Sequence, residues 1–172
     1  SVYEDFYGDN DATCTSGNCP TPVAGQVNGG QQFNGSTTSV NIPASPEFDW
    51  GADASFSVEL WMKSGAQTCV GTSNDDNEVM IGRTEGRFLH WWLGCRFIEG
   101  RATFQLRDRA GNDVTLEGPS ITDGQPHHLV AVRDNATKRN LLYVDGTLVD
   151  STVITYTDSF SSSLPLNLGW LN

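Results

Sequence analysis

Phe56-Ser-Val-Glu-Leu-Trp-Met-Lys63 is the stretch of the sequence that decides the fold class. Apolar side chains occupy every second position, so one side of an extended chain carries four of them, namely Phe56, Val58, Leu60 and Met62. A period of two is typical of a β-strand with one buried face, whereas a helix needs apolar residues three or four positions apart. The stretch therefore predicts a strand that covers a core on one side only.

The same alternation occurs along the rest of the chain, and no long segment has apolar residues at helical spacing. The strongest hairpin signal is Asp145-Gly146, a dipeptide that suits a tight two-residue turn between strands. We predict an all-β fold, a two-sheet antiparallel jelly-roll sandwich, in a single domain over residues 1–172. The expected strands are 30–34, 38–42, 55–63, 78–83, 87–93, 101–107, 113–116, 127–133, 140–145, 147–154 and 165–169.

The charge balance limits the classes of partner. The 172 residues include 10 Lys and Arg against 21 Asp and Glu, which gives a net charge of −11. A surface of this sign repels nucleic acid and anionic membranes. No apolar run approaches the roughly 18 residues of a membrane-spanning helix, so we expect no membrane insertion.

Four cysteines indicate the compartment of the protein. Cys14 and Cys19 flank a short flexible loop, and Cys69 and Cys95 flank a pair of strands. An even number of cysteines in a loop-rich chain favours the disulfides Cys14–Cys19 and Cys69–Cys95, and hence secretion or a place at the cell surface. A zinc site is the alternative, but the sequence has no C-x-x-C motif, that is, no two cysteines with two residues between them.

An ordered set of segments resembles the laminin-G-like (LamG) domain of the concanavalin A-like group. The resemblance covers roughly residues 5–172 and implies two facing antiparallel sheets, one of them concave. Its most specific pieces are the Asp-Gly-x-x-His-His and Leu-Tyr-Val-Asp-Gly segments. The matching segments are Phe33–Gly35, Val40–Pro43, Phe56–Lys63, Asp123–His128, Val132–Asp134, Leu142–Gly146 and Leu166–Gly169.

The chain departs from this family at both ends. LamG domains usually have a strand before the segment that matches Asp5–Thr13 and another after the segment that matches Leu166–Gly169. The loss of both strands would leave sheet edges with unpaired backbone groups. We therefore expect either a fragment of a longer secreted protein or a subunit completed by a strand from a neighbouring chain.

Catalytic patterns are incomplete. Glycan-cleaving relatives of this fold carry an E-x-D-x-x-E pattern on a strand, which provides two facing carboxylates. Glu47 and Asp49 match its start, but Ala52 stands at the third acidic position. His127 and His128 lie in a predicted strand and no serine lies in a nucleophile-elbow motif, so we expect no enzyme activity.

Calcium is the one cofactor that the sequence suggests, because two acidic loops offer the hard oxygen ligands it prefers. The stretch Asn74–Glu78 resembles the Asp-Asn-Glu segment of pentraxins, which makes Asp76 and Asn77 candidate ligands. Asp5 lies in a second loop that resembles a structural calcium loop of the family. For both loops, the partner ligands of the family would come from later segments than this sequence contains.

Alternation also predicts which residues face away from the core and could bind a ligand. We predict such a ligand face, with aromatic rings for stacking on sugars and polar groups for hydroxyls, from Trp61, His90, Trp92, Arg107, Arg133 and Tyr143. The favoured function is an extracellular, non-catalytic recognition module for a glycan or a protein. The alternatives are a structural subunit of a surface appendage and, least favoured, a glycan-cleaving enzyme.

Overall fold

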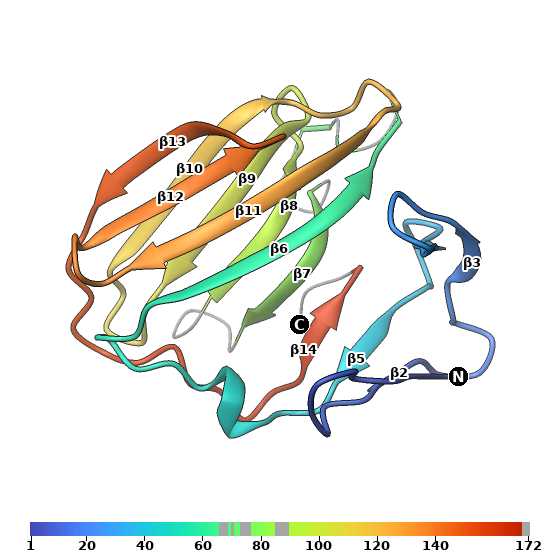
Figure 1. Ribbon diagram of the computed structural model, residues 1–172, viewed down its shortest axis with the longest axis horizontal. Coiled ribbons are helices and arrows are strands. Elements are labelled where there is room, and N and C mark those ends of the chain that lie inside the picture. Colours follow the sequence, from blue (N-terminus) through green and yellow to red (C-terminus); the bar gives the residue numbers. More distant parts are fainter. Residues whose placement is uncertain (66–68, 70, 73–76, 85–89, 170–172) are drawn as a thin grey trace.

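The computed structural model describes residues 1–65, 69, 71–72, 77–84 and 90–169. Within them the chain forms two stacked antiparallel sheets, one small hairpin and one short 3₁₀ turn, with no α-helix (Figure 1). This arrangement confirms the predicted all-β two-sheet sandwich. None of the described helical segments is long and apolar enough to cross a bilayer.

The larger sheet places strands from both ends of the chain beside strands from its middle. It is antiparallel throughout. The order of its strands is β1 (Val2–Tyr3), β2 (Ala12–Thr13), β5 (Val40–Ile42), β14 (Leu166–Leu168), β7 (Glu78–Thr84), β8 (His90–Arg96), β9 (Arg101–Arg107) and β10 (Asp113–Ser120).

The smaller sheet lies across one face of the larger one (Figure 1). Its order is β13 (Thr147–Val153), β12 (Arg139–Val144), β11 (Pro126–Asp134) and β6 (Phe56–Lys63). A separate hairpin pairs β3 (Thr21–Ala24) with β4 (Gly29–Gln32), and the 3₁₀ turn η1 covers Pro46–Phe48. Each predicted strand region overlaps one of the strands β4 to β14, whereas the short strands β1, β2 and β3 were not predicted.

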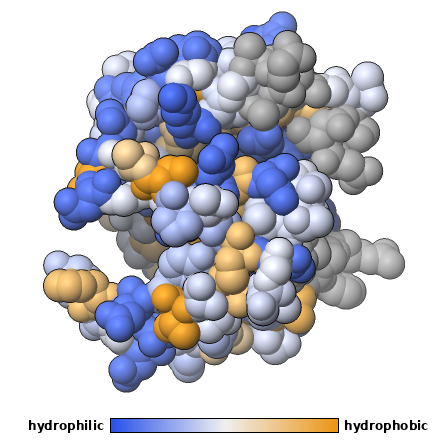
Figure 2. Space-filling view, turned by 90° about the vertical axis from the view of Figure 1, so that its right-hand side faces the viewer, coloured by the Kyte–Doolittle hydropathy of each residue, from blue (hydrophilic) through white to orange (hydrophobic). Residues whose placement is uncertain are grey.

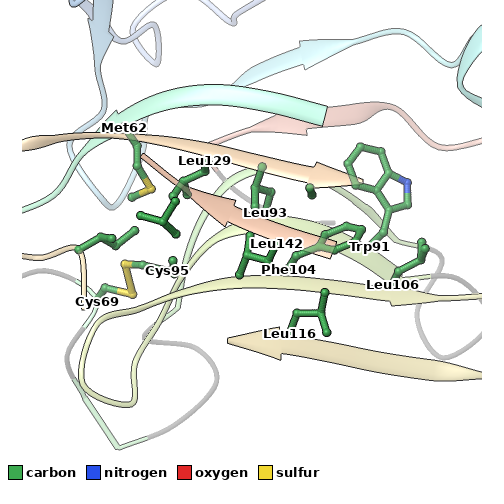
Figure 3. Close-up of a cluster of buried hydrophobic side chains, with 14 of the residues drawn as sticks. Met62, Cys69, Trp91, Leu93, Cys95, Phe104, Leu106, Leu116, Leu129 and Leu142 are labelled. Atoms are coloured by element: carbon green, nitrogen blue, oxygen red, sulfur yellow. A yellow bond between two sulfur atoms is a disulfide. The ribbon is translucent and has the colours of Figure 1, made fainter. Parts of the chain in front are cut away.

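The core consists of side chains from the two facing sheets (Figure 3). Leu93, Phe104 and Leu116 come from the larger sheet, and Leu129 and Leu142 come from the smaller one, all essentially without solvent exposure. In β6 the four apolar residues face this core and the residues between them are exposed, as the alternation predicted. The sandwich is therefore held mainly by burial of one face of each sheet.

Two disulfides form, Cys14–Cys19 and Cys69–Cys95, in the predicted pairing. Cys95 is a core residue of β8, and Cys69 is also buried, so this bridge fixes the segment before β7 to the core (Figure 3). A disulfide limits the conformations of the unfolded chain and so favours the folded state. The Asp145-Gly146 turn also forms as predicted, with φ angles of 51° and 78°.

Arg133 is a core residue, and its prediction as a ligand-binding residue is wrong. Its side chain has 0% exposure, because it shares the inward side of β11 with Leu129 and Ala131. The guanidinium lies over the ring of Tyr156, 4.8 Å from its centroid, and donates to the carbonyl of Ile154 at 3.1 Å. Burial lowers the pKa of Arg133, and the ring and carbonyl compensate part of the desolvation of its charge.

His127 occupies the turn end of β11 between two carboxylates. Its Nδ1 lies 2.8 Å from Asp145 Oδ2, and its Nε2 lies 3.1 Å from Asp123 Oδ1. Asp145 also accepts the backbone N–H of His128 at 2.8 Å. This group of residues connects the loop before β11 to the hairpin between β12 and β13.

The His127 contacts predict a pH dependence of stability. Burial favours the neutral ring, but the hydrogen bonds to Asp145 and Asp123 outweigh it and raise the pKa of His127. A folded-state pKa above the unfolded one means that the contribution to stability is complete below the unfolded pKa and is lost as pH rises through the folded pKa. In urea unfolding, the stability difference between wild type and His127→Gln should be larger at about pH 6 than at about pH 9. The same difference at both pH values would contradict this assignment.

The burial of Arg133 predicts a large loss of stability on truncation. Arg133→Ala removes the contact with Tyr156 and leaves the carbonyl of Ile154 without this donor, so the free energy of unfolding should fall by about 3 kcal/mol. Arg139 is an exposed arginine of the adjacent strand β12, and Arg139→Ala is the matched control, with an expected change below about 0.5 kcal/mol. Equal effects of the two substitutions in chemical denaturation would show that Arg133 is not buried.

Candidate functional site

A cleft of about 2470 Å³ contains most of the candidate chemistry. Part of its wall is the outer face of the larger sheet over β8, β9 and β10, and the hairpin β3–β4 borders it. The side chains that line this part are Trp92, Arg96, Gln105, Arg107 and Thr115. We call this part of the cleft the groove.

Strand alternation places these side chains in the groove. Ala102, Phe104 and Leu106 of β9 are buried in the core, so Gln105 and Arg107 point to the opposite face. The register aligns Gln105 with Trp92 of β8 on one side and with Thr115 of β10 on the other. A polar row therefore crosses three adjacent strands.

Hydrogen bonds connect this row. Trp92 Nε1 donates to Gln105 Oε1 at 2.9 Å, and Gln105 Nε2 donates to both carboxylate oxygens of Asp113 at 3.1 Å. Trp92 is only 3% exposed, so its ring is not an open surface for sugar stacking as predicted. Its indole N–H instead fixes the side-chain amide of Gln105.

Arg107 is partly buried at the end of the same strand, opposite Asp113 in the ladder. Its Nε has no solvent contact and no hydrogen-bond partner among the described residues. Arg96, by contrast, forms an ion pair with Glu117 in the neighbouring part of the sheet. Buried polar groups are normally hydrogen-bonded. Trp91 and Arg133 also have nitrogens without a partner, but Arg107, unlike these two, lines the cleft and is only partly buried, so its side chain is a candidate ligand contact.

Two of the predicted ligand residues belong to the smaller sheet and not to the sheet that forms the groove. Trp61 and Tyr143 belong to the smaller sheet and point away from the sandwich, whereas Trp92 and Arg107 point away from the larger sheet. The predicted residues therefore do not share one sheet face, although Trp61 lines the same cleft as Trp92 and Arg107. His90 begins β8 opposite Arg107, and its side chain lies outside the described part of the chain.

The outer face of the smaller sheet carries an exposed aromatic pair. Trp61 is 46% exposed and stacks on His128, with ring centroids 5.0 Å apart. Glu59 lies 3.6 Å from Nε2 of His128. The ladder then places Val130 and Tyr143 beside Glu59, which makes this face a second candidate surface.

The calcium-ligand candidates that the structure describes already accept hydrogen bonds from the backbone. Asp5 accepts the backbone N–H of Tyr7 at 3.0 Å and that of Asn10 at 3.3 Å. These bonds, the one to Tyr7 first, lower the pKa of Asp5. Asn77 accepts the backbone N–H of Phe97 at 2.9 Å. Asp76 lies outside the described residues, and within those described no group of three or more His, Cys, Asp or Glu side chains could hold a metal ion.

The carboxylates of the partial catalytic pattern are also used structurally. Asp49 pairs with the buried Arg83 at 3.0 Å and accepts the backbone N–H of Ser162 at 3.1 Å. Glu47 accepts a hydrogen bond from the side chain of Asn10 at 2.5 Å. Neither residue lines the described cleft over the larger sheet.

Asp113 is a site residue that the sequence did not identify, and Glu78 was noted only as the end of the acidic stretch 74–78. Asp113 ends the polar row, and its position on the outward side of β10 is the signal that could have found it. Glu78 lines the cleft and accepts from the Ser64 hydroxyl at 3.4 Å. Burial raises the pKa of Glu78, which is a property that only the packed structure shows.

Comparison of the fold with solved structures finds sandwich domains of several proteins. The binding domain of Paraclostridial Mosquitocidal Protein 1 superposes with a TM-score of 0.76 at 13% identity, covering 93% of this chain and 39% of that one. Domain 4 of AbnA, an extracellular GH43 arabinanase from Geobacillus stearothermophilus, gives a TM-score of 0.60 at 18% identity, over 92% and 72% of the two chains. Mouse laminin α1 domains LG4-5 give 0.52 at 16% identity, over 92% and 38%.

The chain thus spans about two fifths of the binding domain of Paraclostridial Mosquitocidal Protein 1, and about two fifths of the botulinum neurotoxin serotype G binding domain, to which it is also similar. No curated protein matches the sequence. The Laminin_G_3 family model, described as the concanavalin A-like lectin/glucanases superfamily, matches residues 34–172. The ordered segments, the two-sheet sandwich and this match agree: the chain belongs to the laminin-G-like family of the concanavalin A-like lectin/glucanase superfamily.

Proposed function

We propose that this domain is a non-catalytic carbohydrate-recognition module that binds a glycan in the groove over β8, β9 and β10. The observation that carries the proposal is the unpartnered Nε of Arg107 beside the hydrogen-bonded row of Trp92, Gln105 and Asp113. These groups provide donors and acceptors at fixed positions on a rigid sheet, which is what recognition of hydroxyl groups requires.

The geometry suits a polar ligand more than an apolar one. Gln105 is held at both ends of its amide, so its orientation is fixed before a ligand arrives. A fixed donor or acceptor loses little conformational entropy on binding. The guanidinium of Arg107 adds a charge-assisted donor, and such bonds are stronger than bonds between neutral groups.

Two structural neighbours support a carbohydrate ligand. Domain 4 of AbnA was solved in complex with arabinotriose. The CBM40 of a Ruminococcus gnavus sialidase was solved with α2,3-sialyllactose, and it superposes with a TM-score of 0.50 at 15% identity over 70% of this chain and 63% of that one. At these low identities the similarity shows only a shared fold. The argument for a carbohydrate ligand therefore rests on the groove residues of this chain.

We also propose that the domain acts outside the cell, because its two disulfides persist in an oxidising compartment. Calcium dependence remains a prediction from the acidic loops around Asp5 and Asn77. We propose to test it within the binding experiment, by comparing buffers with Ca²⁺ and with a chelator. The absence of catalysis follows in this proposal from the structural use of Asp49 and Glu47.

A second candidate surface is the outer face of the smaller sheet. It is favoured by the exposed ring of Trp61, which stacks on His128 with its other side open to a partner. Exposed aromatic rings are frequent anchors of protein interfaces and of sugar stacking. Trp61 also lines the cleft that contains the groove, so this second surface adjoins the groove.

Glycan-array screening of the chain, followed by titration of the best ligand, tests the proposal. Wild type should bind a defined set of glycans, and Arg107→Ala or Gln105→Ala should weaken binding by about tenfold or more, because each removes a bond to the ligand. Tyr143→Ala is the control, since Tyr143 lies on the outer face of the smaller sheet and does not line the cleft, and it should leave the affinity unchanged.

Two results would contradict the proposal. An array without any bound glycan, in Ca²⁺ and in chelator, would remove the carbohydrate function. A loss of binding in Tyr143→Ala with unchanged binding in Arg107→Ala would move the site to the outer face of the smaller sheet. Circular dichroism of each variant shows whether the fold is kept.

A further inference from the structure

The sequence contains two Asn-Gly dipeptides, Asn28-Gly29 and Asn34-Gly35. An asparagine that precedes glycine loses its side-chain amide most readily, because the backbone nitrogen of glycine can attack that amide without hindrance from a Cβ. In a folded chain the rate of this attack depends on whether the two reacting groups can reach each other. The structure holds one of the two dipeptides in place and leaves the other unrestrained.

Hydrogen bonds hold the side-chain amide of Asn34. Its Oδ1 accepts the backbone N–H groups of Ser36, Thr37 and Thr38 at 3.0, 2.9 and 3.1 Å. Its Nδ2 donates to the hydroxyl of Thr37 at 2.8 Å. Attack by the nitrogen of Gly35 would need the amide to rotate away from these partners, so the bonds add to the barrier.

The side-chain amide of Asn28 has no such restraint. The residue is exposed in the turn between β3 and β4, and its side chain has no hydrogen-bond partner among the described residues. Its backbone carbonyl accepts the N–H of Gly25 at 3.3 Å. Figure 2 views the molecule from the right-hand side of Figure 1, where β3 is drawn, and this side is largely hydrophilic. Water and hydroxide therefore reach the turn.

The backbone nitrogen of Gly29 is not used by the ladder between β3 and β4. Residue pairs of an antiparallel ladder alternate between a class that exchanges two hydrogen bonds and a class that exchanges none. Pro22 has no N–H and lies opposite Gln31, so that pair belongs to the second class. Two residues further on, the pair of Ala24 and Gly29 belongs to the same class. The N–H of Gly29 thus points away from β3, and the described sheet of this hairpin has only these two strands.

We propose that Asn28 is a site of spontaneous backbone modification, namely deamidation through a cyclic imide. The nitrogen of Gly29 gives its proton to hydroxide and bonds to Cγ of Asn28, and the bond from Cγ to Nδ2 breaks with release of ammonia. Water then opens the imide at one of its two carbonyl carbons. Opening at Cγ gives aspartate, and opening at the backbone carbonyl carbon gives isoaspartate.

The products change the hairpin in two ways. Both carry one more negative charge than the amide, and isoaspartate also adds one methylene group to the main chain within the turn. The added methylene separates the pair Ala24 and Gly29 from the turn bond of Gly25, so we expect faster amide hydrogen exchange in β3 and β4. The hairpin borders the cleft, but Asn28 itself does not line it.

Incubation of the full chain at mildly alkaline pH, followed by peptide mass spectrometry with fragmentation, tests the proposal. Asn28 should convert at least about tenfold faster than Asn34, because the hydrogen bonds of Asn34 add to its barrier. In guanidinium chloride the two rates should become similar, since both asparagines then precede an unrestrained glycine. The denatured sample thus separates the effect of the fold from that of the dipeptide.

Two variants test the two causes separately. Gly29→Ala hinders the attack and should slow conversion of Asn28 by about tenfold or more. The fold accepts this methyl group, because the only atom within 4 Å of it is the carbonyl oxygen of Val23, at 4.0 Å, and Gly29 does not have a left-handed φ. Thr37→Val removes the hydroxyl that holds Nδ2 of Asn34, and it should speed conversion of Asn34 about threefold while Asn28 is unchanged.

Three results would overturn the proposal. Equal rates at the two asparagines of the folded chain would show that the restraint of Asn34 has no effect. Faster conversion of Asn34 would show that the N–H groups on its Oδ1 activate the amide instead of holding it. An unchanged rate at Asn28 in Gly29→Ala would exclude the attack by this nitrogen. Each readout is the mass of a peptide, so none depends on whether a glycan binds in the groove.

Discussion

The contact between the two sheets determines which side of every strand remains available for binding. Leu93 and Phe104 of the larger sheet meet Leu129 and Leu142 of the smaller one without solvent between them. Because the side chains of a strand alternate, this burial leaves one outer face on each sheet. The polar row of the groove and the outward residue Tyr143 therefore lie on different sides of the sandwich, whereas Trp61, on the last strand of the smaller sheet, also lines the cleft that contains the groove.

Much of the fold could be predicted from the sequence because most strands alternate strictly between a core and a solvent face. The prediction failed where that signal is missing. Strands β1 and β2 have two residues each, and β3, Thr21–Ala24, is exposed along its whole length, so no buried face leaves a pattern. The bulge of β7 after Val79 is likewise set by its neighbour β8, where a side chain at Gly94 would collide with the carbonyl of Glu78.

The candidate site was predictable only in part. Alternation along a strand predicts which face of the sheet a side chain points to, but it does not predict whether other parts of the chain cover that side chain. Gln105 and Arg107 point outward as expected. Trp92 also points outward, yet it is buried, since surrounding chain covers the indole and Gln105 accepts its N–H. Arg133 was predicted to point outward, but it has the same phase along β11 as Leu129 and Ala131 and so points into the core. Tyr156, which is distant in sequence, supplies the ring that makes an inward arginine tolerable.

The use of cationic residues explains why Arg107 stands out in an acidic protein. Arg83 and Arg133 are fully buried and hold loop carbonyls to the sheets. Arg96 and Arg101 pair with glutamates at the surface of the larger sheet. Each of these four has at least one such contact, although Nε and Nη2 of Arg133, like Nε of Arg107, have no hydrogen-bond partner among the described residues. Arg107 differs from Arg133 because it lines the cleft. Keeping a guanidinium nitrogen away from both water and a partner costs stability, and in the proposed function the exposed part of the Arg107 side chain would contact the ligand.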